Sequence, residues 1–392
     1  MSIRQRVLLG SVMTVCGSLL LAAPASALTI NPVFGSVGED YGVGPTVDLS
    51  GNAAAVGAID AAAHQISSQF GNDLTVNIMF VGAHDGPNGF LGASLSGQTA
   101  YTYDQYTTAL KKDSTGHLTN STLASAVSNL PSGNGASDPS NTMVLPTTPL
   151  ARLLGLGVGV PTEFGPANST PQFDNSGVYL GGGGTVDAVI FLNLDNPLSF
   201  TRPVPDISSG VVFDAQSTME HEIDEVLGIG GSGSTLNDLL DDPNFAEDFF
   251  GVTPAGNLLG ALDLYRYSNG LASYAVDSDF TDPSQVQSAY FSIDGGLTPI
   301  DFFNQQFMAF GDAADWALTF SVCPGGDFVG GTGDVQDAFG CNNVQADVVP
   351  GSPSYIALQA VGYDVPEPLT ASVFGFGLLG AAALRRRKKQ NS

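Results

Sequence analysis

The residues of this chain best suited to chemistry are five consecutive ones, His221-Glu-Ile-Asp-Glu225. Zinc-binding helices often carry the pattern H-E-x-x-H, in which two histidines one helical turn apart bind the same ion. Here Glu225 stands where the second histidine would be. His221 and Glu225 can still face one divalent metal, and Glu222 then lies beside it as a general base. The segment therefore predicts a metal site with a catalytic carboxylate.

A helix must position these side chains, and the surrounding sequence predicts one. Ser217 and Glu220 fit a capping box, which would make Ser217 the N-cap of the helix. Gly228 allows the chain to leave the helix. Four apolar residues form a stripe that would face a core: Met219, Ile223, Val226 and Leu227.

Apolar periodicity predicts further helices and strands before this segment. We expect helices at residues 52–70, 101–112 and 121–130, and strands at residues 74–81, 185–193 and 211–213. Residues 131–148 are rich in Ser, Pro, Gly and Asn, which predicts a loop. Beyond residue 231 the pattern weakens into Gly, Asp and aromatic residues, so we expect an irregular C-terminal part.

The third metal ligand does not follow from spacing alone. Position 231, where a longer histidine pattern would place a ligand, is glycine. Asp263 is the first candidate, because it lies in a downstream block of apolar and aromatic residues. The alternatives are Asp238, Asp241, Asp242 and Glu247.

Two other sets of residues have a functional and a structural interpretation. Tyr265, Arg266 and Tyr267 can stabilise an oxyanion, or they can pack in the core with Arg266 paired to an acid. The other three histidines are more often surface or capping residues than ligands: His64, His84 and His117.

Both ends of the chain carry export signals. Arg4 and Arg6 precede an apolar run at residues 7–23 and the small residues Ala25-Ser-Ala27, as in a secretory signal peptide. Near the other end, Val365-Pro-Glu-Pro368 leads into an apolar stretch and five basic residues. The 16 apolar or small residues at 369–384 would span about 24 Å as a helix, short of a hydrocarbon core of about 30 Å. A plain membrane anchor is the alternative.

Charge and cysteine content limit the binding partners, metal ions and cross-links that we expect. Residues 28–368 hold all 38 acidic residues but only five of the 12 basic ones, a formal charge of −33. Such a surface repels nucleic acid and anionic membranes; it also makes the protein soluble, and it can hold hard cations. Calcium is therefore a second candidate ion, for which the Asp/Gly-rich segment 327–347 offers oxygen ligands. Cys323 and Cys341, exported together, predict a disulfide rather than a cysteine metal site.

Two parts of the sequence resemble known families. The tripartite tail resembles the PEP-CTERM sorting signal of Gram-negative bacteria, which an exosortase cuts. Residues 220–228 (Glu-His-Glu-Ile-Asp-Glu-Val-Leu-Gly) resemble the motif of secreted metalloproteases with such tails, which show H-E-I-x-E. Four later blocks are similar as well: residues 262–268, 290–296, 311–316 and 357–364.

The resemblance implies an α+β, zincin-like metalloprotease fold with a mixed sheet, an active-site helix and an irregular C-terminal subdomain. We expect a signal peptide at residues 1–27, subdomains at 28–230 and 231–364, and a sorting signal at 365–392. The resemblance also implies that His221, Glu225 and a third residue bind zinc and that Glu222 is the catalytic residue.

Two hypotheses follow from the sequence. One is an exported zinc peptidase that cuts extracellular or envelope proteins at the surface or in the matrix of a Gram-negative bacterium. The other is a catalytically silent zincin-like protein with a structural or adhesive role in that matrix. No serine-nucleophile elbow, P-loop or dinucleotide fingerprint competes with the motif.

Overall fold

The structure is a computed structural model. It describes residues 27–35, 44–87, 89–117, 119–130, 142–157, 172–173, 179–180, 186–204, 212–241, 244, 247, 257–268, 271–272, 289–304, 311–317, 334–338, 340 and 343–366. Residues 1–26 and 367–392, with most of the expected signal peptide and sorting signal, lie outside this part. So do Cys323 and Cys341, and with them the expected disulfide.

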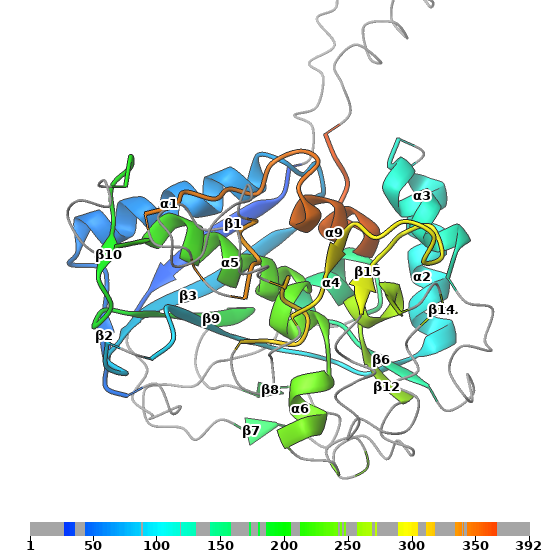
Figure 1. Cartoon of the computed structure of the whole chain (residues 1–392), viewed down its shortest axis with the longest axis horizontal. Helices are drawn as coiled ribbons and strands as arrows, with labels where there is room; N and C mark the ends of the chain where they lie inside the picture. Colours follow the sequence, from blue (N-terminus) through cyan, green and yellow to red (C-terminus); the bar gives the residue numbers. More distant parts are fainter. Residues whose placement is uncertain are drawn as a thin grey trace, which may run out of the picture.

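A mixed five-stranded sheet forms the centre of the molecule (Figure 1). Its strands follow the order β1-β3-β9-β4, and β2 pairs with the last part of β3. Their bounds are β1 Thr29–Phe34, β2 Thr46–Asp48, β3 Thr75–Ala83, β4 Gly92–Ser96 and β9 Ala188–Asn193. β1, β3 and β9 are parallel, whereas β2 and β4 run antiparallel to their partners. β4 is therefore an antiparallel edge strand.

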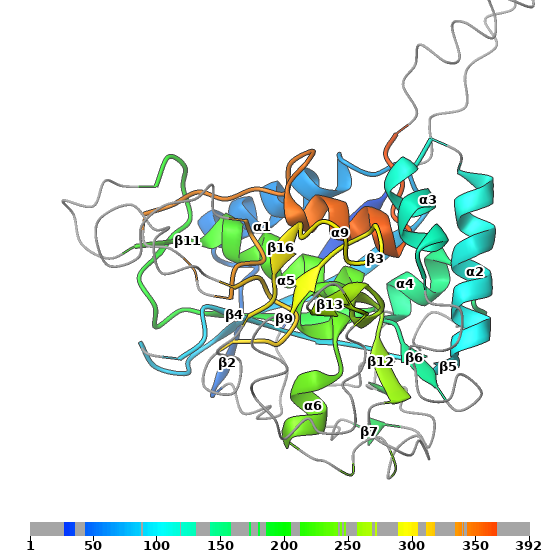
Figure 2. The same ribbon diagram turned by 45° about the vertical axis from the view of Figure 1, so that its right-hand side comes forward.

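The two faces of this sheet belong to different apolar clusters, because side chains alternate along a strand. Ile78, Phe80 and Ile190 face the main core, whereas Val81 and Val189 belong to a smaller cluster on the other face. Helices α1 (Ala53–Ser67) and α5 (Ala215–Leu227) contact each other and the sheet. Figures 1 and 2 both show them side by side along it.

The remaining elements are short. The helices are α2 Tyr103–Gly116, α3 Ser121–Ser128, α4 Thr148–Leu153, α6 Leu236–Asp241 and α9 Pro353–Val361, with 3-10 turns η2 Gly230–Gly233 and η4 Leu262–Tyr265. The strands are β5 Tyr101–Thr102, β6 Met143–Leu145, β7 Gln172–Phe173, β8 Tyr179–Leu180, β10 Leu198–Ser199, β11 Phe213–Asp214, β12 Leu258–Gly260, β13 Arg266–Ser268, β14 Leu271–Ala272, β15 Tyr290–Phe291 and β16 Asp301–Phe302. They form small sheets around the central one.

One apolar core joins the two expected subdomains. Ile59 and Leu227, which precede residue 231, share it with Leu262, Trp316 and Tyr363, which follow it. Each of these side chains is almost fully buried. The segments before and after residue 231 therefore pack as one unit. Residues from both segments line the cavity next to α5.

The α+β class and the mixed sheet are confirmed, and the expected helices and long strands all form. Two details of the prediction are wrong. Residues 143–145, expected in a loop, form β6, and α5 begins at Ala215 with Asp214 as its N-cap rather than Ser217. Among the described residues, no helix combines the length and hydrophobicity that a membrane crossing needs.

Candidate metal centre

The N-terminus of α5 is fixed by contacts from distant segments. Asp214 accepts a hydrogen bond from the backbone N–H of Gln216 and one from the hydroxyl of Ser217. Arg202 pairs with Asp214 at 2.6 Å and also reaches Asp347. Because Asp214 already accepts from one of the first free N–H groups, that of Gln216, the helix starts three residues earlier than the local capping box predicts.

The C-terminus of α5 ends as the sequence predicts. Gly228 has φ of 105°, and the backbone N–H groups of Gly228 and Ile229 both donate to the carbonyl of Asp224. Only glycine adopts this left-handed conformation without strain. The predicted apolar stripe is fully buried, which fixes the rotation of the helix about its axis: Met219, Ile223, Val226 and Leu227.

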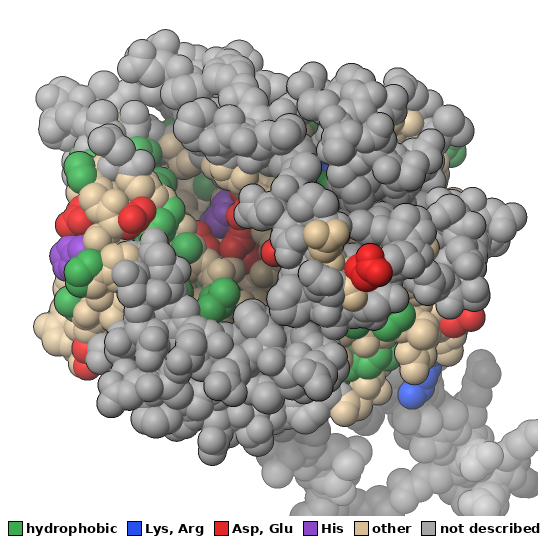
Figure 3. Space-filling view, turned by 90° about the horizontal axis from the view of Figure 1, so that it is seen from below, with side chains coloured by type: hydrophobic (Ala, Val, Ile, Leu, Met, Phe, Trp, Pro, Cys, Tyr) green, Lys and Arg blue, Asp and Glu red, His purple; other side chains and the backbone are tan. Residues whose placement is uncertain are grey.

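The opposite side of α5 forms the floor of a cavity of about 700 Å³. Figure 3 shows this hollow, with a histidine and several acidic side chains at its base. The titratable residues that line it are one histidine and seven acids: His221, Asp214, Glu222, Glu225, Asp312, Asp315, Asp334 and Asp337. No described Lys or Arg lines it. The cavity is therefore strongly anionic.

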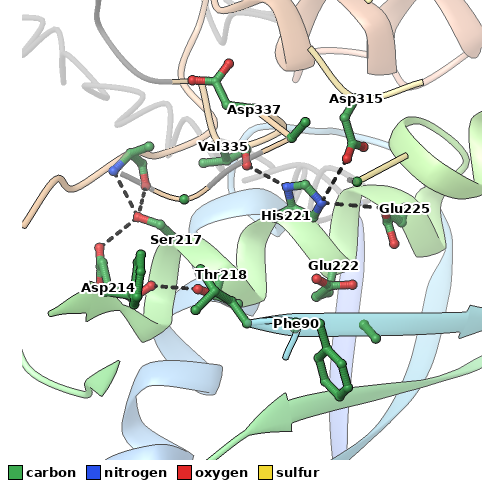
Figure 4. A pocket seen from close by; sticks show the side chains of 18 of the residues that line it. Phe90, Asp214, Ser217, Thr218, His221, Glu222, Glu225, Asp315, Val335 and Asp337 are labelled. Carbon is green, nitrogen blue, oxygen red and sulfur yellow. Dashed lines mark hydrogen bonds and ion pairs between the residues drawn. The ribbon is translucent and has the colours of Figure 1, made fainter. Parts of the chain in front are cut away.

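Three side chains converge at the base of this cavity. His221 Nε2 lies 3.5 Å from Glu225 Oε1 and 3.9 Å from Asp315 Oδ2 (Figure 4). One atom from each of the three lies within 4.8 Å of the others, so the group can hold a metal ion. Tetrahedral zinc with bonds of about 2.0–2.2 Å keeps its ligand atoms roughly 3.3–3.6 Å apart. The observed separations suit such an ion after small movements.

Neighbouring residues orient two of these ligands. His221 Nδ1 lies 2.8 Å from the carbonyl oxygen of Val335 and donates to it. The other ring nitrogen, Nε2, therefore faces the point where the three ligand atoms converge. Glu225 accepts a hydrogen bond from the Ser94 hydroxyl at 2.6 Å and one from the Gly231 N–H at 3.0 Å. Metal sites commonly hold their ligands by such second contacts.

Burial and mutual charge shift the pKa values of this group. Burial opposes a charge on His221, but Asp315, Glu225 and Glu222 together raise its pKa well above the usual value. Burial and then Glu225 raise the pKa of Glu222 well above its usual range. Burial also raises the pKa of Asp315 to about 6. One imidazole thus faces more carboxylates than it can neutralise, and a divalent cation would relieve this repulsion.

Comparison with known proteins gave no match. No family model, no curated protein and no solved structure is similar to this chain at a significant level. The chemistry of the site therefore has to be argued from its own residues.

Glu222 has the environment of a general base beside the proposed ion. It is 4% exposed, and its Oε2 atom is buried without a hydrogen-bond partner. A Cβ atom at position 92 would lie 2.6 Å from Glu222 Oε1, so only glycine lets β4 pass this close. A buried carboxyl group with an unused oxygen, facing a cavity, is available to a ligand or a water molecule.

The structure does not bring Asp263 to this group. Its two oxygens accept hydrogen bonds from Ser234, Thr235, Gly260 and Arg266. Gly260 and Arg266 lie three residues from Asp263 in the chain, whereas Ser234 and Thr235 lie 29 and 28 residues before it, and the network holds the turn around η4. Asp315 takes the place expected for Asp263 as the third candidate ligand.

Among the described residues, no other candidate from the sequence analysis joins this group. Asp238 and Glu247 are exposed, and neither the Asp241 side chain nor Asp242 is within the described part of the chain. Tyr265 donates to the Ala360 carbonyl, Tyr267 stacks on Tyr290, and Arg266 pairs with Asp263 and lies over the Phe303 ring. The structural interpretation of residues 265–267 is thus confirmed.

Gln336 was not a candidate from sequence, yet it contacts two of the three ligands. Its amide nitrogen lies 3.1 Å from His221 Nε2 and 2.9 Å from Asp315 Oδ1. Its carbonyl oxygen is buried without a partner. Turning the amide by 180° would exchange these atoms and direct an oxygen to the point where the three ligand atoms converge. Gln336 can therefore supply a fourth ligand atom, the third oxygen of the group.

Gly231 occupies the position where the longer histidine pattern would place a ligand. A Cβ atom there would lie 2.6 Å from Glu225 Oε1 and 2.8 Å from Asp312 Oδ2. Gly231→His should therefore displace Glu225 and lower zinc affinity by roughly 10- to 100-fold, the usual effect of disturbing a ligand's supports. Competition with a chromophoric chelator measures it. Gly57→Ala is the control, since nothing lies within 4 Å of a Cβ there. Unchanged affinity in Gly231→His would contradict the geometry.

Proposed function

We propose that this protein is an exported zinc-dependent peptidase. The observation that carries the proposal is the convergence of His221, Glu225 and Asp315 beside the buried carboxyl group of Glu222, whose Oε2 atom has no hydrogen-bond partner. The two groups have different chemical roles. His221, Glu225 and Asp315 can hold a cation, and Glu222 can move a proton next to it.

Zinc suits this donor set better than calcium does. A nitrogen ligand and two carboxylates in a tight group favour a borderline ion with tetrahedral geometry. Calcium takes six to eight oxygen ligands at longer distances, and an imidazole is a poor ligand for it. When bound, zinc would polarise a substrate carbonyl and lower the pKa of a water molecule at its open position.

The residues of this chain would then perform the proton transfers. Glu222 accepts a proton from the attacking water and delivers it to the leaving amine nitrogen. Glu225 and Asp315 would hold the ion together with His221 and offset part of its positive charge, and the Val335 carbonyl oxygen fixes the orientation of the His221 ring. The cavity walls reduce the exposure of this group to bulk water, which strengthens each electrostatic contact.

The edge strand β4 supports a peptide substrate. Gly92, Ala93 and Ser94 line the cavity, and among the described strands β4 pairs with β9 alone. An extended peptide can add to such an edge through backbone hydrogen bonds. This would place its carbonyl groups along the floor, near His221 and Glu222.

The broader proposals follow from the sequence signals together with this site. A mixed sheet with a metal helix beside its edge strand is compatible with the zincin-like fold that the motif resemblance implies. From the terminal signals we propose that the protein lies outside a Gram-negative cell and has an exosortase-type partner. A catalytically silent matrix protein would bind the ion but would not cleave a substrate.

Metal content and cleavage of unfolded casein test the proposal. We expect the wild type to cleave casein, to lose this activity in a strong chelator and to regain it with zinc. His221→Gln should bind one zinc ion fewer than the wild type and should be inactive. Equal zinc content in the two proteins would reject the site, and zinc binding without cleavage by the wild type would favour the silent protein.

A further inference from the structure

A second His/Asp group lies away from the cavity, where α2 and α3 approach the segment after α9. Its members are Asp113, His117 and Asp364, and one ligand atom of each lies within 4.8 Å of the others. α2, α3 and α9 lie together at one end of the molecule in Figure 2, and α3 contacts both other helices. None of the three residues lines the cavity.

One ring nitrogen serves both carboxylates of this group. His117 Nδ1 lies 3.1 Å from Asp113 Oδ1 and 2.7 Å from Asp364 Oδ2. A ring nitrogen carries at most one hydrogen, so it cannot donate a full hydrogen bond to both. A metal ion can bind both oxygens and the nitrogen at once.

The charges of the group are not balanced by the described residues. The Asp113 and Asp364 side chains are 11% and 9% exposed, and neither is paired with a described Lys or Arg. Asp113 Oδ2 is buried and has no hydrogen-bond partner. A divalent cation would neutralise both carboxylates.

Asp364 is held in place independently of His117. Asn120 donates to Asp364 Oδ1 at 3.0 Å, and Asn72 donates to Oδ2 at 3.3 Å. The backbone of Asp364 also bonds to Asn72 and Gly71. His117, in contrast, caps the end of α2 and its side chain is 49% exposed. Two ligands are thus preorganised by burial, and the third can adjust from the solvent side.

We propose that Asp113, His117 and Asp364 form a second zinc site, which ties the end of α2 to the chain after α9. An imidazole nitrogen with two carboxylates is a donor set for zinc rather than for calcium. The ligand separations of 2.7 and 3.1 Å need to open by less than about 1 Å to reach tetrahedral spacing. Water at the exposed side of His117 completes the shell.

The test counts zinc ions bound to the full chain after dialysis against zinc alone. We expect two ions in the wild type, one in His117→Gln and one in His221→Gln. His84→Gln is the matched control, because His84 is also exposed but pairs with a single carboxylate, Asp195 at 2.8 Å. It should keep two ions. Added zinc should raise the Tm of the His221→Gln protein but not that of the His117→Gln, His221→Gln double variant.

The outcomes separate this site from the cavity. A wild type with the same zinc content as His117→Gln overturns the second site, whatever His221→Gln shows. Loss of an ion in His117→Gln but not in His221→Gln supports the second site and rejects the proposed function. If His117→Gln does not fold, as judged by circular dichroism, Asp113→Asn replaces it and should lose the same ion.

Discussion

Glu222→Gln is expected to lower casein cleavage by about 100- to 10,000-fold, the usual contribution of a general base. The amide has nearly the same shape as the carboxyl group but cannot accept the proton of the attacking water. Zinc content should stay at the wild-type level, because Glu222 is not among the three convergent ligands. Initial rates at saturating substrate, with elemental analysis of the same sample, measure both effects.

Glu220→Gln is the matched control for this change. Glu220 lies on the same helix and is as deeply buried, but it bonds to Gln216 and the Val348 N–H and does not line the cavity. We expect it to retain wild-type cleavage. A Glu222→Gln protein that cleaves casein at the wild-type rate would show that another group moves the proton.

Asp315→Asn is expected to weaken zinc binding at the cavity by more than about 100-fold. The substitution removes a negative charge and one ligand oxygen, a larger loss than that of a supporting residue, which typically costs 10- to 100-fold. The fold should tolerate it, since burial already disfavours the charge of Asp315. Chelator competition, carried out in the His117→Gln background, reports the cavity ion alone.

Asp263→Asn should show the opposite pattern. It leaves the guanidinium of Arg266, which is buried, without its charged partner. Breaking a buried pair in this way costs about 3–5 kcal/mol, so the urea midpoint should fall while the folded protein binds zinc as the wild type does. If folded Asp263→Asn lost the cavity ion and Asp315→Asn kept it, the assignment of the third ligand would be wrong.

Much of the central fold can be predicted from local patterns. The β-branched runs that become β3 and β9 and the apolar stripe of α5 each carry their own periodicity. The start of α5 cannot be predicted in this way. Ser217 and Asp214 are both good N-cap residues, and the choice depends on Arg202, whose contacts with Asp214 and Asp347 exist only in the folded chain.

The candidate site can likewise be predicted from the sequence only in part. His221, Glu222 and Glu225 share a helix, so their spacing alone places them together. Asp315 and Gln336 lie in irregular segments, where no period relates them to α5. The chain has 38 acidic residues, and the sequence does not show that Asp263 already accepts hydrogen bonds from several donors whereas Asp315 reaches His221.

The main core has a consequence for the time course of biosynthesis. It includes Leu28 near the start of the described chain and Tyr363 near its end, and Asp315 comes long after the helix that it completes. A nascent chain that has reached only α5 therefore possesses the histidine and both glutamates without the third carboxylate or the closed cavity. Under the proposed function, an unfinished chain would therefore be inert, and peptidase activity would arise only once the whole polypeptide has been made.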